Sequence, residues 1–386
     1  PILLLDSGKS QYDVVSHFTS SLAKGFEKSG VSAKIIKTTA IDQSVADEMS
    51  ELKADLVVSF FSFFDVANDA FFSRMLPIPV LYVAVDGPEY FINKLQNENC
   101  FLSVRDYYSF KMVSEIGKKK LIVLLHACDN DFSVPVKKDR PYPVVFFGTA
   151  LPPNAADEEL SQIPSPIQSA LRRAVELNLK NPYSSHYDSL LFSLKQDPEI
   201  NRNMLLELNL YRLLQIMELK VRAHDRIDLI NSIKDHEVHV FGGGFLNASW
   251  KDYLHNDNIV LHDQISFEDT LKIMAQSKIV LSSSPHIRFG GHERIFYAYQ
   301  MGALPLVNFT PFVEEEFKIG ENIETYYPGH LTEVDKTISK YLNDETLRDK
   351  LVIEGRKIVQ ERHTWDNRAQ QILEQLKPFF SDEFKS

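Results

Sequence analysis

Residues 278–307 read KIVLSSSPHIRFGGHERIFYAYQMGALPLV, and this stretch decides the fold. The apolar run 278–281 stops at three serines, which is typical of a buried strand. The pair Gly290–Gly291 precedes a helix-forming run that ends at Gly302, and a second apolar run follows at 303–307. Strand, glycine loop, helix and strand predict one βαβ unit of a parallel sheet.

The loop of this unit is expected at the carboxyl end of its strand, where open α/β sheets bind ligands. A backbone without side chains at two glycines and the N-terminus of a helix both suit a phosphate group. Four donors and one acid surround this point: His286, Arg288, His292, Arg294 and Glu293. The pattern predicts an anion and sugar site, and the alternative is a surface loop with solvated charges.

Length and charge limit the class of protein. A chain of 386 residues suits two domains, and a net charge of −11 argues against nucleic acid or anionic lipid as a partner. Cys100 and Cys128 lack metal or redox spacing, which favours a reducing compartment. The longest apolar run, 56–64, is too short to span a bilayer, and the chain opens without a signal-peptide pattern. We therefore expect a cytoplasmic protein with no transmembrane segment.

The first 140 residues alternate short apolar runs with amphipathic stretches, which predicts a parallel sheet covered by helices. Six strands are expected, in a Rossmann-like domain: 2–5, 33–36, 56–64, 80–85, 101–104 and 121–125. Asp86 ends the fourth of these strands beside Gly87. A carboxylate in that position suits general-base work on an acceptor hydroxyl, and the alternative is an aspartate that caps a turn.

A second Rossmann-like domain is expected over 141–365, opening on a strand that ends at Gly148 and Thr149. Residues from about 155 to 235 contain no convincing strand and show apolar spacing of three and four, which predicts a helical insertion. The insertion has three open roles: capping the cleft, recognising an acceptor or forming a dimer face. Residues 366–386 are expected to form a final helix.

The strand pattern resumes at 238–241 and is followed by Gly242, Gly243 and Gly244. Three glycines at a strand end permit close approach to a ligand, and a plain tight turn is the alternative. The next strand leaves at Gln264 and Ile265, after which Ser266 is placed to cap a helix.

Two motifs carry a resemblance to a known family. Gly291-His292-Glu293-Arg294-Ile295-Phe296, followed by 302–307, resembles the donor-side motif of glycosyltransferases with the GT-B fold. The run 361–369, ERHTWDNRA, is similar to the closing signature of the spore-maturation-protein-like "group 1" glycosyltransferases. The resemblance implies two Rossmann-like domains that face each other across a cleft, with the nucleotide sugar held by the second and the final helix crossing back to the first.

The resemblance also implies roles for individual residues. Gln264 and Ile265 would meet the nucleotide base, Thr310 would contact the donor, and Glu293 would bind a sugar or ribose hydroxyl. Retaining relatives carry a glutamate at the two positions that Phe289 and Tyr297 occupy here, so the stereochemical outcome stays open. With Asp86 and Glu293 as catalytic candidates, the donor-binding candidates are Gly148, Thr149, Gly242, Gly243, Gln264, Ile265, His286, Arg288, Gly290, Gly291, His292, Arg294 and Thr310.

The sequence thus predicts a transferase that moves a sugar from a nucleotide-diphosphate sugar, with UDP favoured, to a glycan, protein or small-molecule acceptor. No cofactor and no essential metal are expected, because Asp129-Asn130-Asp131 is interpreted as a loop rather than a metal-binding triplet. Two alternatives remain: a nucleotide-sugar epimerase of the same fold, and a non-catalytic module that binds nucleotide or sugar. The oligomeric state stays open.

Overall fold

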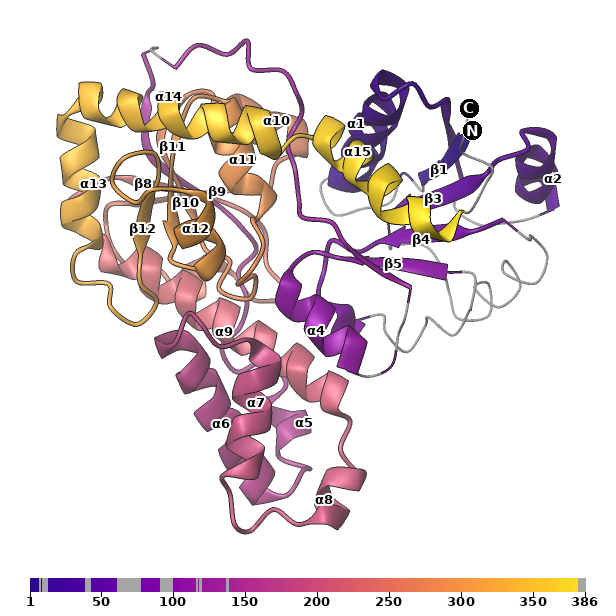
Figure 1. The fold of residues 1–386 in the computed structure, drawn as a ribbon. Helices are drawn as coiled ribbons and strands as arrows, with labels where there is room; N and C mark the ends of the chain where they lie inside the picture. Colours follow the sequence, from indigo (N-terminus) through magenta and orange to yellow (C-terminus); the bar gives the residue numbers. More distant parts are fainter. Residues whose placement is uncertain are drawn as a thin grey trace. The chain divides into compact units, whose positions relative to one another are not determined.

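The computed structural model describes residues 1–6, 8, 13–38, 43–60, 78–90, 100–115, 117, 120–136 and 139–380 (Figure 1). The chain falls into two compact units. The first comprises Pro1–Asp131 and Val359–Ser386, and the second comprises Phe132–Ile358. None of the described helices combines the length and the apolar character needed to cross a membrane.

The first unit contains a six-stranded sheet in the order β2-β1-β3-β4-β5-β6, and all its pairings are parallel. Strands β1, β3, β4 and β5 are buried along their length, as expected for a parallel sheet covered on both faces. The sequence prediction extends the third strand to residue 64, and positions 61–64 lie outside the described residues. The strands are β1 Ile2–Asp6, β2 Ala33–Lys37, β3 Leu56–Phe60, β4 Val80–Val83, β5 Cys100–Val104 and β6 Leu121–Val123.

Helices from both ends of the chain cover this sheet: α1 Val14–Lys28, α2 Gln43–Glu51, α4 Tyr107–Glu115 and α15 Trp365–Leu376. Helix α15 begins at a capping box in which Thr364 and Asn367 satisfy each other's backbone amides. Its first residue, Trp365, packs against the rings of Phe18 and Phe60, with ring centroids 4.9 and 5.7 Å away. Farther along, the Gln375 amide bonds both main-chain groups of Val123, so α15 also covers the edge strand β6.

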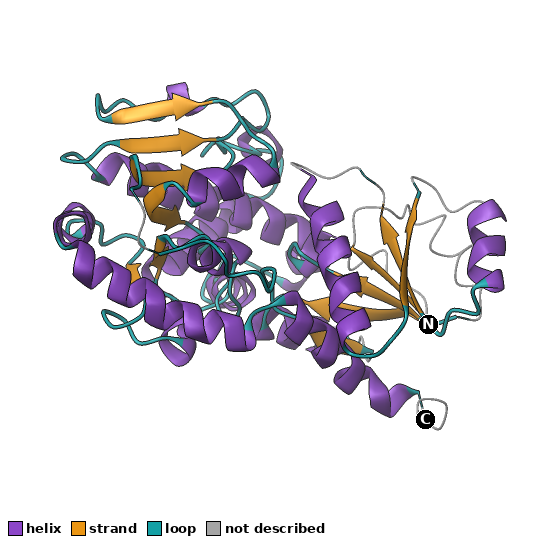
Figure 2. Cartoon of the chain, turned by 90° about the horizontal axis from the view of Figure 1, so that it is seen from above, coloured by secondary structure: helices purple, strands orange, loops and turns teal. Residues whose placement is uncertain are grey.

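The second unit contains another six-stranded parallel sheet, in the order β12-β11-β10-β7-β8-β9. Figure 2 shows helices beside the strands of this sheet, as expected for a parallel sheet whose faces are covered. The strands are β7 Tyr142–Phe147, β8 Val238–Phe241, β9 Ile259–His262, β10 Ser277–Ser282, β11 Leu304–Asn308 and β12 Glu324–Tyr326. The predicted α/β class with two parallel sheets is confirmed.

Five helices separate β7 from β8: α5 Asp157–Leu160, α6 Ser165–Lys180, α7 His186–Lys195, α8 Arg202–Leu206 and α9 Leu210–Ser232. This segment is the helical insertion that the sequence predicts. Helices α6 and α7 pack against each other and against α9 (Figure 1). The remaining helices of the unit are α10 Phe267–Met274, α11 Glu293–Gln300, α12 Pro311–Glu316, α13 Val334–Asn343 and α14 Glu345–Arg362, of which the last contains the boundary with the first unit.

Gly25 sits where α1 touches α15. A Cβ at this position would lie 2.8 Å from the Trp365 carbonyl oxygen and 3.0 Å from the Ala369 Cβ. We expect Gly25→Ala to lower the free energy of unfolding by about 1–3 kcal/mol, because overpacking outweighs the ~1 kcal/mol that alanine adds to helix propensity. Urea unfolding measures the change, and the exposed Glu27→Ala on the same helix is the control. A Gly25→Ala protein as stable as wild type would contradict close packing of α1 on α15.

Candidate functional site

The predicted donor residues of the second unit follow its strands β7 to β11. Because all six strands are parallel, the loops after them emerge at one edge of the sheet. Ser284 and Asn308 join two of these loops, since the Ser284 amide donates to the Asn308 side-chain oxygen at 2.7 Å in a buried position. Thr310 lies two residues farther on, is buried, and caps α12 by accepting from the Val313 amide at 3.2 Å.

The glycines after β7 and β8 allow the main chains of these two loops to approach each other closely. A Cβ on Gly242 would lie 2.0 Å from the Gly148 carbonyl oxygen, so no larger residue fits there. The same carbonyl accepts from the Trp250 indole nitrogen at 3.0 Å. A Cβ on Gly243 would lie 2.7 Å from the Gln264 side-chain oxygen. The structure thus brings Gly148, Gly242, Gly243 and Gln264 together, and both Gln264 and the half-buried Ile265 remain accessible to solvent.

Asp225 on α9 ties the ends of β10 and β12 together. One of its carboxylate oxygens accepts from the Ser283 hydroxyl at 2.5 Å and from the Tyr326 hydroxyl at 2.7 Å. The other oxygen has no hydrogen-bond partner among the described residues. Burial raises the pKa of the Asp225 carboxyl, against the lowering effect of these hydrogen bonds and of the charges on Arg288 and Arg226.

Arg226, the next residue on α9, is buried against the loop after β7. It donates to the Thr149 carbonyl at 2.9 Å, and its Cζ is 3.6 Å from the place where a Gly148 Cβ would lie. Burial lowers the pKa of its guanidinium, and the positive charges of Arg222 and Arg294 lower it further. The carboxylates of Asp225 and Glu218 offset part of this effect, and Glu218 also pairs with Arg222 at 2.9 Å. Arginine keeps its proton in proteins.

His286 and Arg288, in the loop after β10, are both buried. One terminal nitrogen of Arg288 donates to the main-chain oxygen of Asn178 at 2.7 Å and to its side-chain oxygen at 2.8 Å. The Arg288 carbonyl accepts from the Phe312 amide at 3.1 Å. Arg288 is thus held between α6 and α12.

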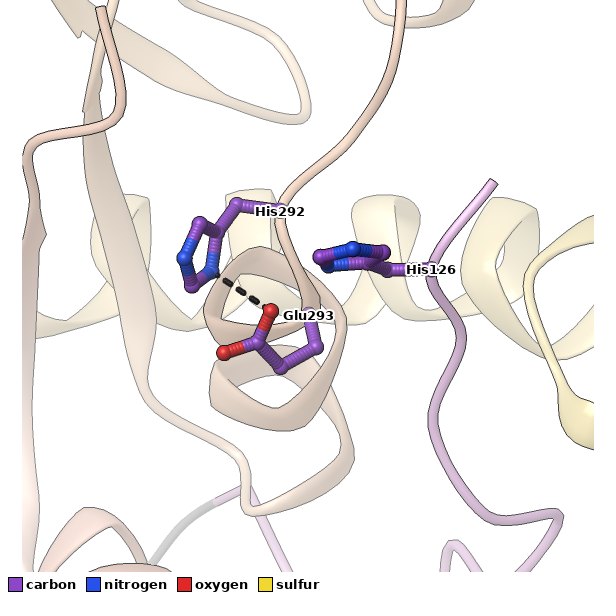
Figure 3. Close-up of side chains that lie close together, drawn as sticks. All are labelled: His126, His292 and Glu293. Atoms are coloured by element: carbon purple, nitrogen blue, oxygen red, sulfur yellow. Dashed lines mark ion pairs between the residues drawn. The ribbon is translucent and has the colours of Figure 1, made fainter. Parts of the chain in front are cut away.

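Helix α11 begins at Glu293, and its N-cap residue, His292, directly follows Gly290 and Gly291. A Cβ on Gly291 would lie 2.3 Å from the Phe296 ring, so this close approach requires glycine. The His292 Nδ1 is 2.9 Å from a Glu293 carboxylate oxygen and 3.3 Å from the Arg294 amide (Figure 3). A single nitrogen cannot donate to one and accept from the other. The shorter, charge-assisted contact favours a proton on Nδ1 that points at Glu293.

Asp86 belongs to the first unit. Its side chain is exposed in the turn between β4 and the 3₁₀ helix Pro88–Tyr90. The Val85 carbonyl beside it accepts from Arg105 at 3.3 Å and lies 3.2 Å from the His126 Nε2, so buried side chains that follow β5 and β6 hold this turn. The role of Asp86 as a general base therefore stays a prediction.

Sequence reasoning missed three residues of this region: Asn178, Asp225 and Arg226. All three are buried on helices of the insertion. The available signal was a charged pair, Asp225-Arg226, set among the apolar residues Val221, Leu229 and Ile230 of a helix expected to pack on a sheet. Charged side chains are rarely buried without a partner or a function.

Asp225 gives a prediction about pH. Its folded-state pKa lies above the usual 3.8, so the protonated carboxyl adds stability that is fully present below pH 3.8 and is lost as the pH rises through the folded-state pKa. Asp225→Asn removes this titration. We expect its free energy of unfolding, relative to wild type, to increase from about pH 4 to pH 7 in urea titrations. The exposed Asp257→Asn is the matched control, and a relative stability of Asp225→Asn that stays flat with pH would exclude this role for Asp225.

The chain is similar to known proteins both in sequence and in fold. Residues 222–374 match the model of a family described as glycosyl transferase-like. An uncharacterized protein of Aquifex aeolicus (strain VF5) is 32% identical over 114 residues, which are 29% of this chain and 28% of that protein. The chain therefore matches less than a third of that relative's length.

Solved structures of similar fold cover nearly the whole chain. HepE of Anabaena, crystallised with UDP-glucose, has a TM-score of 0.53 and 14% identity over 98% of this chain and 99% of its own. Sucrose-phosphate synthase of Thermosynechococcus elongatus has a TM-score of 0.55 and 10% identity over the same shares. A glycosyltransferase of Rickettsia africae ESF-5 has a TM-score of 0.51 and 11% identity over 99% of this chain and 98% of its own.

The family match and the fold confirm the resemblance seen in the sequence motifs. The chain has the two-domain α/β fold of GT-B glycosyltransferases and, over residues 222–374, the sequence features of the glycosyl transferase-like family.

Proposed function

We propose that this protein transfers a sugar from a UDP-sugar and that Arg226 and Arg294 hold the donor diphosphate. The observation that carries the proposal is the buried Arg226 guanidinium, which donates to the Thr149 carbonyl and lies against Gly148. Arg222 and Arg294 repel this guanidinium, and Asp225 and Glu218 offset part of the repulsion. Positive charges that repel one another in a buried place are stabilised when an anion binds between them. UDP is the favoured nucleotide because HepE was crystallised with UDP and with UDP-glucose.

The chemistry requires negative charge to be stabilised as the diphosphate leaves. Arginine side chains and the N-terminus of α11 supply that stabilisation without a metal ion, which makes a metal-independent reaction our proposal. Glu293 is assigned to a hydroxyl of the sugar or ribose, as an acceptor whose orientation His292 fixes. Asp86 of the first unit is assigned as the base that takes the proton of the acceptor hydroxyl.

Arg294→Ala tests the anion site. We expect UDP to bind about tenfold more weakly or worse, because a charged hydrogen bond contributes roughly 1.5–3 kcal/mol. Isothermal titration calorimetry with UDP measures the change, and Arg202→Ala, an exposed arginine of α8, is the matched control. An Arg294→Ala protein that binds UDP as tightly as wild type would remove Arg294 from the site.

Incubation of the wild-type protein with UDP-glucose and a chelator distinguishes the possible reaction classes. Released glucose and UDP, with water as acceptor, support a metal-independent transferase. An epimerised UDP-sugar would support the epimerase instead, and UDP-glucose binding without turnover would favour a binding module. Loss of turnover on adding chelator would contradict metal independence.

Asp86→Asn tests the base. The rate of UDP-glucose hydrolysis should fall by about 100-fold or more while the affinity for UDP stays the same, since general-base catalysis contributes roughly 100- to 10,000-fold. Asp47→Asn, an exposed aspartate of α2, controls for the loss of one negative charge in the first unit. Equal hydrolysis rates in wild type and Asp86→Asn would rule out the assignment.

A further inference from the structure

The helical insertion has a contact with the donor loop that suggests a role beyond the three that its sequence leaves open. Asn178, near the end of α6, is fully buried, and both of its oxygens accept from one terminal nitrogen of Arg288. Arg288 is 1% exposed. A charge buried to this degree needs such partners, and hydrogen bonds to ionised groups are stronger than neutral ones.

The side-chain amide of Asn178 is oriented by its other partners. Its nitrogen donates to the Ser184 carbonyl at 2.9 Å, in the turn between α6 and α7. Ser184 in turn shares a 2.7 Å hydrogen bond with the hydroxyl of Ser189 on α7. An asparagine nitrogen can only donate and its oxygen can only accept, so this contact turns the oxygen toward Arg288.

The fixed position of Arg288 limits the position of the loop that leads to the proposed donor site. Its carbonyl accepts from Phe312 at the start of α12, so the residue is fixed from two sides. Three residues later Gly291 packs on the Phe296 ring, and His292 is then the N-cap residue of α11. A short segment held at Arg288 and again at Gly291 has little freedom to move, which sets the position of the α11 N-terminus and of Arg294.

We propose that Asn178 is a positioning residue and that the insertion holds the loop 286–292 in its binding conformation through the Asn178–Arg288 contact. This inference rests on the proposed function in one respect, namely that α11 and Arg294 bind the donor diphosphate. The insertion thus acts on the donor loop from within the same unit. Preorganised binding groups cost less to order when the ligand arrives.

Asn178→Ala tests this inference in the whole chain of 386 residues. Hydrogen–deuterium exchange without nucleotide should become faster in 286–292, because the loop loses a charged hydrogen bond. Binding of UDP, measured by calorimetry, should weaken by about tenfold, the lower end of the effect of such a bond. Asn178→Asp keeps an oxygen for Arg288 but loses the donor to Ser184, so it should restore slow exchange in the loop.

Leu194→Ala, a core substitution on α7, is the control for a general loosening of the insertion. It should lower the melting temperature and leave exchange in 286–292 unchanged. Unchanged loop exchange in Asn178→Ala, or equal acceleration in Leu194→Ala, would overturn the positioning role. A third outcome separates the two proposals. If exchange in 286–292 is faster only in Asn178→Ala and the wild-type protein does not bind UDP, the positioning of the loop is supported and the proposed function is refuted.

Discussion

The burial of two opposite charges side by side on α9 constrains the carboxyl edge of the second sheet. Asp225 is stabilised only where Ser283 and Tyr326 present their hydroxyls, and Arg226 only where the Thr149 carbonyl accepts from it. A buried charge without such partners would cost several kcal/mol. The ends of β7, β10 and β12 must therefore take up these positions together, and the loops that follow them inherit a defined geometry.

The two parallel sheets could be predicted from the sequence because apolar runs and glycines are strong signals of buried strands and close turns. Continuous apolar runs such as 278–281 and 303–307 are required for strands covered on both faces, and glycine is required where Gly242 meets Gly148. The missed residues share a different property. Asn178 and Arg226 act through partners more than 70 positions away, Arg288 and Thr149, and no local pattern specifies such a pairing. For the donor-binding and catalytic residues, the sequence offered candidates that remain proposals.

Similarity of fold and similarity of sequence carry different information in this protein. The solved structures share 10–14% identity with it, so their likeness lies in the order of strands and helices rather than in side chains. The family match begins at residue 222, within α9 and just before the Asp225-Arg226 pair. Helices α5–α8 lie outside that match, and one of them, α6, contacts Arg288 through Asn178.

The packing of Trp365 against Phe18 and Phe60 has a consequence for biosynthesis. The second unit is one continuous segment, Phe132–Ile358, and can complete its core while the ribosome is still translating the chain. The first unit cannot complete its core at that stage, because α1 and the edge strand β6 pack against α15, which is translated after the whole second unit. At about 5–20 residues per second, its apolar surface stays uncovered for tens of seconds, an interval in which chaperones protect nascent chains.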